Sequence, residues 1–325
     1  MRFLVVGAGA VGGVIAARLF QAGHDVTAVA RGPHLLAIQS HGLRLETPLE
    51  AVTLPVPAVG DPAGFAWQDD DVVILAVKSQ DTVAALTALA AVAPSSVLVV
   101  CAQNGVANER AALRWFPAVA GMCVMCPTSH LSPGVVQAHS SPITGLLDVG
   151  DFPTGAGDRV SAVATALSAS GFESVPRPDI MRWKHAKLLM NLGNAVEALC
   201  GPAARGSSLV TMAQAEGEAC FAAAGIDYAS AAEDEARRGD LLTMRPIDGQ
   251  RRGGGSSWQS LQRGTGAIEA DYLNGEVVLL GRLHGVPTPV NALLQRLANE
   301  AAQDRTPAGS VGEDSLLAQL PRVAS

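Results

Sequence analysis

The chain begins with the stretch Met1-Arg-Phe-Leu-Val-Val-Gly-Ala-Gly-Ala-Val-Gly-Gly13, an apolar run followed directly by closely spaced glycines. The apolar run predicts a buried strand, and Gly7, Gly9 and Gly12 have the spacing of a turn that binds a dinucleotide pyrophosphate. A pyrophosphate must approach backbone N–H groups at a helix N-terminus, and a side chain at these glycines would obstruct the turn, the approach or the helix packing. The segment Val11 to Phe20 is predicted to form that helix.

The composition indicates a globular protein of one or two domains, because the 325-residue chain is 48% apolar and 16% charged. The net charge of −7 argues against nucleic-acid binding, since a phosphate polymer needs a basic stripe. No apolar run approaches the length of about 18 residues that spans a bilayer, and the first glycines fit a phosphate turn better than a secretory signal. We therefore expect a cytoplasmic protein with no membrane or nucleic-acid partner.

The five cysteines do not have the pattern of a disulfide framework. Cys123 and Cys126 form a single C-x-x-C pair, whereas a structural zinc ion needs four ligands. We predict buried thiols and no metal site.

The first half of the chain alternates strand-like and helix-like segments, which predicts an α/β fold with a doubly wound parallel sheet of Rossmann type. Between Gly42 and Pro62, two short runs interrupted by proline predict antiparallel strands. Beyond residue 175 the pattern changes to long helices. We predict a dinucleotide-binding domain over residues 1–175 and an all-helical domain over residues 176–325, with a flexible tail after about residue 305.

Long helices are predicted in the second half, and helical second domains of this kind often pair through exposed apolar faces, so we expect a homodimer. They cover 180–199, 209–225, 230–238, 266–284 and a last segment after Pro289.

The end of the second predicted strand favours NADP over NAD as the cofactor. Asp or Glu usually stands there in NAD-binding folds, but this chain has Arg31, whose guanidinium can bind a 2′-phosphate. A solvated loop arginine is the alternative. Lys78 and Asn104 follow two further predicted strands, at the sheet edge where α/β folds bind ligands, although Asn104-Gly105 alone would indicate only a turn.

A polar face is predicted on the helix 180–199. Lys187, Asn191 and Asn194 are spaced by four and three residues, which places them on one face of a continuous helix. A partly desolvated lysine can act as a general acid, with Lys184 as the rival candidate and an exposed surface lysine as the ordinary alternative. Further along the chain, the carboxylate of Glu269 is a candidate partner for the lysine.

Taken together, these residues resemble the ketopantoate reductases (2-dehydropantoate 2-reductases), which use NADPH to reduce 2-dehydropantoate to pantoate in pantothenate biosynthesis. The resemblance spans nearly the whole chain. It rests on Gly7-Ala-Gly-Ala-Val-Gly12, Arg31, Val77-Lys78, Gln103-Asn104-Gly105, the helix from Trp183 to Leu199, Ser256-Ser257 and Glu269-Ala-Asp-Tyr-Leu-Asn-Gly275.

The resemblance implies a role for each candidate residue, and a helical domain like the C-terminal domain of 6-phosphogluconate dehydrogenase. Lys187 would donate a proton to the ketone oxygen of a small α-keto acid, assisted by Glu269, while the nicotinamide supplies hydride. The implied substrate-binding residues are Asn191, Asn194, Ser257 and Asn104. The implied NADP-binding residues are Gly7, Gly9, Gly12, Arg31, Lys78 and Asn104, the last at the nicotinamide end.

The sequence departs from the family pattern in its substrate-binding half. The family helix has a second asparagine eight residues after the lysine, where this chain has Ala195, with Asn194 one residue earlier. Leu261 replaces an acid often found four residues after the serine. A related reductase of another α-keto or β-hydroxy acid is therefore an alternative, and a non-catalytic NADP-binding sensor is an alternative of a different class.

Overall fold

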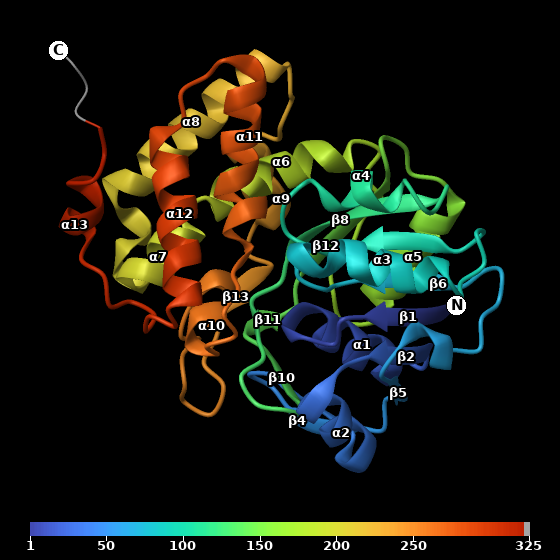
Figure 1. The fold of residues 1–325 in the computed structure, drawn as a ribbon. Coiled ribbons are helices and arrows are strands. Elements are labelled where there is room, and N and C mark those ends of the chain that lie inside the picture. Colours follow the sequence, from blue (N-terminus) through green and yellow to red (C-terminus); the bar gives the residue numbers. More distant parts are fainter. Residues whose placement is uncertain (322–325) are drawn as a thin grey trace. The chain divides into compact units, whose positions relative to one another are not determined.

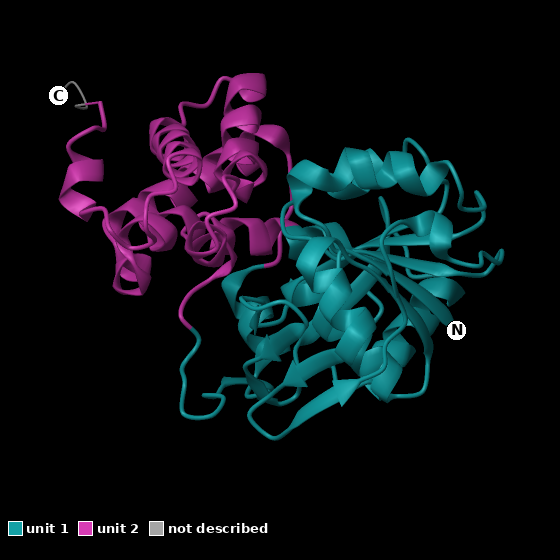
Figure 2. Cartoon of the chain, turned by 60° about the horizontal axis from the view of Figure 1, so that its bottom comes forward, with its two compact units in different colours: residues 1–184, 230–252 teal, residues 185–229, 253–325 magenta. Residues whose placement is uncertain are grey.

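The computed structural model describes residues 1–321, which form two compact units (Figure 2). Unit 1 contains Met1–Lys184 together with Ser230–Arg252. Unit 2 contains His185–Ala229 and the chain from residue 253 onward. The sequence predicts a single boundary near residue 176, whereas the structure returns a later segment of the chain to unit 1.

The main sheet of unit 1 has seven strands in the order β12-β8-β7-β6-β1-β2-β5 (Figure 1). All neighbouring pairs are parallel except β12 with β8, which is antiparallel. This confirms the predicted parallel α/β fold. The strands are β1 (Arg2–Val6), β2 (Asp25–Val29), β5 (Ala58–Val59), β6 (Val72–Leu75), β7 (Leu98–Cys101), β8 (Val119–Met125) and β12 (Leu146–Asp151).

Helices cover both faces of this sheet, because successive side chains of a strand point to opposite sides. Phe3 and Val5 of β1 belong to one apolar core, and Leu4 and Val6 belong to the other. The first core is covered by α1 (Ala10–Gln21), α2 (Gly32–His41) and α5 (Asp158–Ala169), and the second by α3 (Thr82–Ala90) and α4 (Asn108–Ala112). Short 3-10 turns precede α3 and follow β5, namely η2 (Ser79–Asp81) and η1 (Pro62–Gly64).

A smaller sheet in unit 1 has the order β4-β3-β10-β9. Its strands β3 (Leu43–Glu46) and β4 (Ala51–Leu54) are antiparallel, which confirms the hairpin predicted from the sequence. The other strands are β9 (Thr128–Ser129) and β10 (Val135–Ala138).

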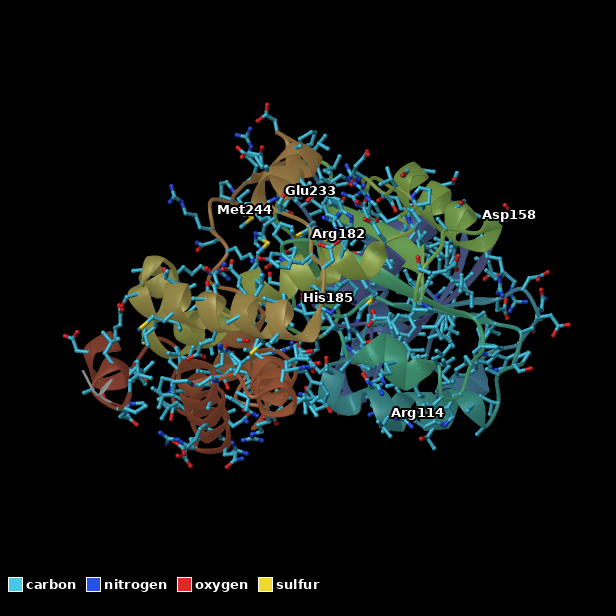
Figure 3. The ribbon with its side chains drawn as sticks, turned by 90° about the horizontal axis from the view of Figure 1, so that it is seen from above. Arg114, Asp158, Arg182, His185, Glu233 and Met244 are labelled. Atoms are coloured by element: carbon cyan, nitrogen blue, oxygen red, sulfur yellow. The ribbon has the colours of Figure 1, made fainter. Side chains whose placement is uncertain are left out.

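The segment 230–252 belongs to unit 1 and holds α9 (Ala231–Arg238) and β13 (Leu242–Met244). Strand β13 pairs with β11 (Ser140–Pro142). On α9, Glu233 forms an ion pair with Arg182 at 3.0 Å, and the two side chains lie beside one another in Figure 3. Arg237 donates to both carboxylate oxygens of the buried Asp148 at 2.7 and 2.9 Å. Polar contacts therefore hold this returning segment to the sheet unit.

Unit 2 is helical, and its longest predicted helix is interrupted. The sequence predicts one helix over 180–199, but α6 (Ile180–Asn191) ends before Leu192-Gly193 and α7 (Asn194–Cys200) begins after it. The predicted helix over 266–284 is likewise divided into η4 (Glu269–Tyr272) and α11 (Asn274–His284). The remaining elements are η3 (Pro202–Gly206), α8 (Ser208–Ala224), α10 (Ser256–Gln262), α12 (Pro289–Gln303) and α13 (Glu313–Leu317).

The described part of the chain beyond residue 305, which the sequence predicts to be a flexible tail, contacts α7. The amides of Gly309 and Val311 donate to the carbonyl oxygens of Ala198 and Leu199 at 2.9 Å each, so the tail is bound to the end of α7. Leu316 of α13 is fully buried. The part of the predicted tail over 322–325 lies outside the described residues.

The cysteines are free thiols in the structure. Burial raises the pKa of the Cys126 thiol to about 12, and the Cys123 thiol contacts the carbonyl oxygen of Trp183 at 3.7 Å. Among residues 1–321, none of the helices has both the length and the apolar character needed to cross a membrane.

The buried Asp148 generates a stability prediction. It accepts hydrogen bonds from Arg177, Arg237 and the amide of Val175. Asp148→Ala would leave two arginines without this partner, and we expect a loss of about 3–5 kcal/mol in the free energy of unfolding of unit 1. Urea denaturation followed by circular dichroism measures this. The matched control is Glu300→Ala, which breaks an exposed pair with Arg296 and should cost less than about 1 kcal/mol; equal losses would contradict the prediction.

Candidate active site

Two of the glycines after β1, Gly7 and Gly12, lie too close to neighbouring atoms for any side chain. Gly7 has φ +96°, and a Cβ there would lie 2.8 Å from the amide nitrogen of Val77. A Cβ at Gly12 would overlap the carbonyl oxygen of Gly7 and lie 2.9 Å from the Cβ of Ala76. The turn is therefore packed directly against the chain that leaves β6.

Gly9 differs from the other two glycines, because a Cβ there would meet no atom of the protein within 4 Å. Its position is the N-cap of α1, where backbone N–H groups of the first helical turn are available to a ligand. Packing within the protein therefore does not require glycine here. The open space at Gly9 and the free amides of the first helical turn are compatible with the approach of a dinucleotide pyrophosphate to the backbone.

The structure brings Lys78 and Asn104 to the same edge of unit 1 as the glycine turn. Lys78 directly follows Val77, which contacts the turn, and it is half-buried. The Gln103 amide donates to the carbonyl oxygen of Val77 at 2.9 Å. The Asn108 amide donates to Ser79 Oγ at 3.2 Å and to the carbonyl oxygen of Asn104 at 3.3 Å. These bonds join the loops that follow β6 and β7.

Arg31 lies at the N-cap of α2 and is exposed. The start of α2 is connected to the glycine turn by His34, whose Nε2 lies 2.7 Å from the carbonyl oxygen of Ala8. The amide of Gly134 donates to His34 Nδ1 at 2.8 Å. Since a carbonyl can only accept, Nε2 carries the proton and the ring is neutral. Sequence reasoning missed His34, because only its contacts in space connect it to the turn.

Lys184 belongs to unit 1, where its side chain is 2% exposed. Its Nζ lies 2.6 Å from Oε1 of the buried Glu109 and donates to the carbonyl oxygens of Gln103 at 2.8 Å and Met122 at 3.3 Å. An ammonium group has three N–H donors; two of them donate to these carbonyl oxygens, and the carboxylate of Glu109 pairs with the ammonium charge. The geometry thus separates Lys184 from Lys187, which the sequence leaves as rivals.

Lys187 and the two asparagines lie around the interruption between α6 and α7. Lys187 is half-buried on α6, three residues beyond Lys184, and Asn191 is the buried last residue of that helix. Asn194 is the buried first residue of α7. The prediction that all three share one face rested on a continuous helix, so that argument does not hold for Asn194.

Asn194 and Ser257 are connected through the buried Glu197. Arg205 donates to Oε2 of Glu197 at 2.7 Å and to Oδ1 of Asn194 at 3.3 Å. The same Oε2 accepts the amide of Gly255 at 3.1 Å, and a Cβ at Gly255 would lie 2.5 Å from it. Gly255 is the N-cap of α10, which carries the buried Ser257. One carboxylate therefore orients the starts of both short helices.

Glu269 is buried on η4, and its charge acts on Arg263 at the end of α10. Burial lowers the pKa of Arg263, and the negative charge of Glu269 opposes this effect. A little further along, Asn274 donates to the carbonyl oxygen of Leu192 at 3.1 Å. Asn274 therefore supports the turn between α6 and α7, a structural function that the sequence pattern did not reveal.

Comparisons with known proteins bear on both units. Residues 3–153 match the family model described as ketopantoate reductase PanE/ApbA, and residues 179–302 match its C-terminal model. The chain belongs to the ketopantoate reductase family. It is therefore an oxidoreductase of that kind, and the family predicted from the sequence is confirmed.

Three similar proteins illustrate the range of the family fold. A 2-dehydropantoate 2-reductase of Mesorhizobium japonicum is 32% identical, over 92% of this chain and 98% of the relative. A ketopantoate reductase structure from Ralstonia eutropha JMP134 is 29% identical, with a TM-score of 0.78, 94% of this chain and 99% of that chain covered. A D-mandelate dehydrogenase solved with NADH and anilino(oxo)acetate has the same TM-score and coverage at 21% identity, which shows a shared fold.

The neutral ring of His34 generates a prediction on pH. Burial lowers the pKa of His34, so the unfolded chain binds a proton more readily than the folded chain. The stability that this neutral ring provides is present above pH ~6.5 and is lost as the pH falls toward the lowered pKa. We expect the difference in free energy of unfolding between the wild type and His34→Ala to narrow from pH 7.5 to pH 5. The exposed His41 on the same helix provides the control variant His41→Ala, and a gap that widens toward low pH would contradict the prediction.

Proposed function

We propose that this chain catalyses the NADPH-dependent reduction of 2-dehydropantoate to pantoate. The observation that carries the proposal is the edge of unit 1, where the glycine turn, with no protein atom within 4 Å of a Cβ built at Gly9, lies beside Lys78 and Asn104. The ketopantoate reductase family supplies the reaction class.

The cofactor contacts follow from this edge. The amides at the start of α1 would hold the pyrophosphate, with Lys78 nearby, and Asn104 would hold the nicotinamide end. Arg31 occupies the position where NAD-binding folds usually have Asp or Glu. Its exposed guanidinium is suited to binding the 2′-phosphate of NADP. When bound, the nicotinamide supplies the hydride that reduces the ketone carbon.

Lys187 is the proposed general acid. As hydride reaches the carbonyl carbon, the electron pair of the C=O bond moves to oxygen, and the Nζ of Lys187 donates a proton to it. The resulting neutral amine regains a proton from solvent. Lys184 does not suit this step, because it pairs with Glu109 and already donates to two carbonyl oxygens.

Unit 2 supplies the proposed substrate contacts. The buried Asn191, Asn194 and Ser257 offer neutral donors for the carboxylate and hydroxyl groups of a small keto acid, and Asn104 is a further proposed substrate-binding residue. The buried Glu269 is proposed to orient the substrate hydroxyl and Lys187. These groups position the keto acid for hydride transfer.

A second candidate is the reduction of another α-keto acid. Where the family helix has its second asparagine this chain has Ala195, and the preceding Asn194 accepts a hydrogen bond from Arg205. A change at a substrate-binding residue alters which substrate is accepted more readily than it alters the type of reaction. The cofactor and the general acid would therefore be the same in both candidates.

The proton donor can be tested by substitution. We expect Lys187→Ala to reduce kcat for ketopantoate about 10²- to 10⁴-fold while NADPH still binds, because a general acid acts in the transition state. NADPH oxidation at 340 nm measures kcat, and added methylamine should restore part of it. Unchanged turnover in Lys187→Ala would exclude Lys187 as the acid.

The wild type distinguishes the candidate functions. NADPH binding with turnover of another keto acid would support the second candidate, and NADPH binding without any turnover would support a sensor.

The cofactor preference can be tested at Arg31. Arg31→Ala should raise the KM for NADPH about 10- to 100-fold and leave the KM for NADH nearly unchanged, because only NADPH carries the 2′-phosphate. Arg44→Ala is the control, since Arg44 is a partly exposed arginine of the same unit that pairs with Glu46. An equal change for both cofactors would show that Arg31 does not contact the 2′-phosphate.

A further inference from the structure

Unit 1 contains a buried ion pair that the proposed reaction does not use directly. The side chains of Lys184 and Glu109 are 2% and 0% exposed, with Nζ and Oε1 at 2.6 Å. Removing two charges from water costs several kcal/mol per ion, and replacing such a pair by apolar residues is often neutral or stabilising. Stability alone is therefore a weak reason for this pair to be present.

The position of the pair suggests a second reason. Strands β7 and β8 are paired up to Cys101 and Gly121, and beyond this point the chains separate. Lys184 Nζ donates to the carbonyl oxygens of Gln103 and Met122, which lie beyond the last residues that pair β7 with β8, although Met122 still pairs with Val149 of β12. The lysine thus replaces the sheet hydrogen bonds where they end, at the carboxyl edge of the sheet.

The backbone held in this way leads directly to Asn104. Gln103 receives the lysine at its carbonyl oxygen, and its side chain donates to Val77 O and to Thr82 Oγ1 at 2.7 Å. The next residues are Asn104 and Gly105, whose φ of +78° suits glycine. The turn is therefore fixed from both sides of Gln103.

A glycine of strand β8 leaves space for the side chains of Lys184 and Glu109. A Cβ at Gly121 would lie 3.3 Å from both Oε1 of Glu109 and Cδ of Lys184. A larger residue at this strand position would press on both charged side chains. The strand therefore accommodates the pair with a glycine.

We propose that Lys184 and Glu109 are positioning residues, which hold the Gln103-Asn104 turn so that the nicotinamide end of the cofactor is aligned for hydride transfer. The inference rests on the proposed function for the identity of the cofactor. It assigns to Lys184 an effect on cofactor alignment that is distinct from proton donation.

The test compares the full-length wild type with Lys184→Met, Glu109→Gln and the double variant. Three quantities are measured for each: the thermal unfolding midpoint, the Kd of NADPH from its fluorescence, and kcat with NADPH and with C4-deuterated NADPH. Arg237→Met is the matched control, because it removes a buried positive charge from the same unit at the Asp148 cluster.

We expect Lys184→Met to lower both the midpoint and kcat, the latter about 100-fold, because small misplacements of reacting groups have effects of this size. In the double variant no charge is left buried without its partner, so the midpoint should recover toward the wild type. The value of kcat should remain low, because Gln103 O still lacks its donor. Arg237→Met should lower the midpoint with little effect on kcat or on the Kd of NADPH.

Recovery of kcat together with the midpoint in the double variant would overturn the proposal and leave a purely structural pair. Restoration of Lys184→Met by added methylamine would also overturn it, since Lys184 would then be the acid. If Lys184→Met does not fold, the double variant is compared with the wild type in the same way.

A wild type that binds NADPH without reducing ketopantoate counts against the proposed function alone. In that case the Kd of NADPH tests the positioning role of Lys184 and Glu109. The proposal requires the double variant to bind NADPH at least tenfold more weakly than the wild type.

Discussion

The close approach of the first turn to the chain after β6 is the constraint on which unit 1 depends. Gly7 and Gly12 leave no room for a Cβ between the turn and Ala76-Val77, so strand β1, helix α1 and the end of β6 are brought into direct contact. Lys78 therefore lies next to the turn through the path of the backbone. Glutamine and asparagine side chains after β7 extend the same edge toward Asn104. The binding edge is thus a consequence of backbone packing, and the polar side chains act on a frame that the glycines determine.

Much of this frame could be predicted from local sequence. The glycine turn, the alternation of strands and helices, and the β3–β4 hairpin depend on short-range rules of spacing and residue type, and the structure has each of them. The carboxyl-edge positions of Lys78 and Asn104 also followed, because parallel strands end at one edge. The roles of these residues remain predictions, since they depend on a bound ligand.

The remaining features could not be predicted because they depend on contacts between distant residues. The interruption after Asn191 occurs in a run with helical spacing, and the turn is supported by Asn274, which is 82 residues away from Leu192. The segment 230–252 has the pattern of an ordinary surface helix and strand. Its attachment to the sheet unit depends on Arg237 and Asp148, which are 89 residues apart. The tail beyond residue 305 contains proline, glycine and serine, which are typical of loops, yet the amides of Gly309 and Val311 bind the end of α7.

The two lysines of α6 show what the local sequence can and cannot indicate about the chemical role of a residue. Lys184 and Lys187 lie less than one turn apart, and either could be a desolvated acid. The acceptors around Lys184 bear on this choice. At Lys184 the ammonium group pairs with a buried carboxylate and donates to the carbonyl oxygens of Gln103 and Met122, so it cannot transfer a proton without breaking the support of the β7 edge. A parallel sheet leaves unpaired carbonyls where its strands diverge, and buried carbonyls need donors. A lysine at this position satisfies them, and the paired glutamate makes its burial tolerable. Support of the sheet edge and support of the cofactor turn are then the same set of bonds.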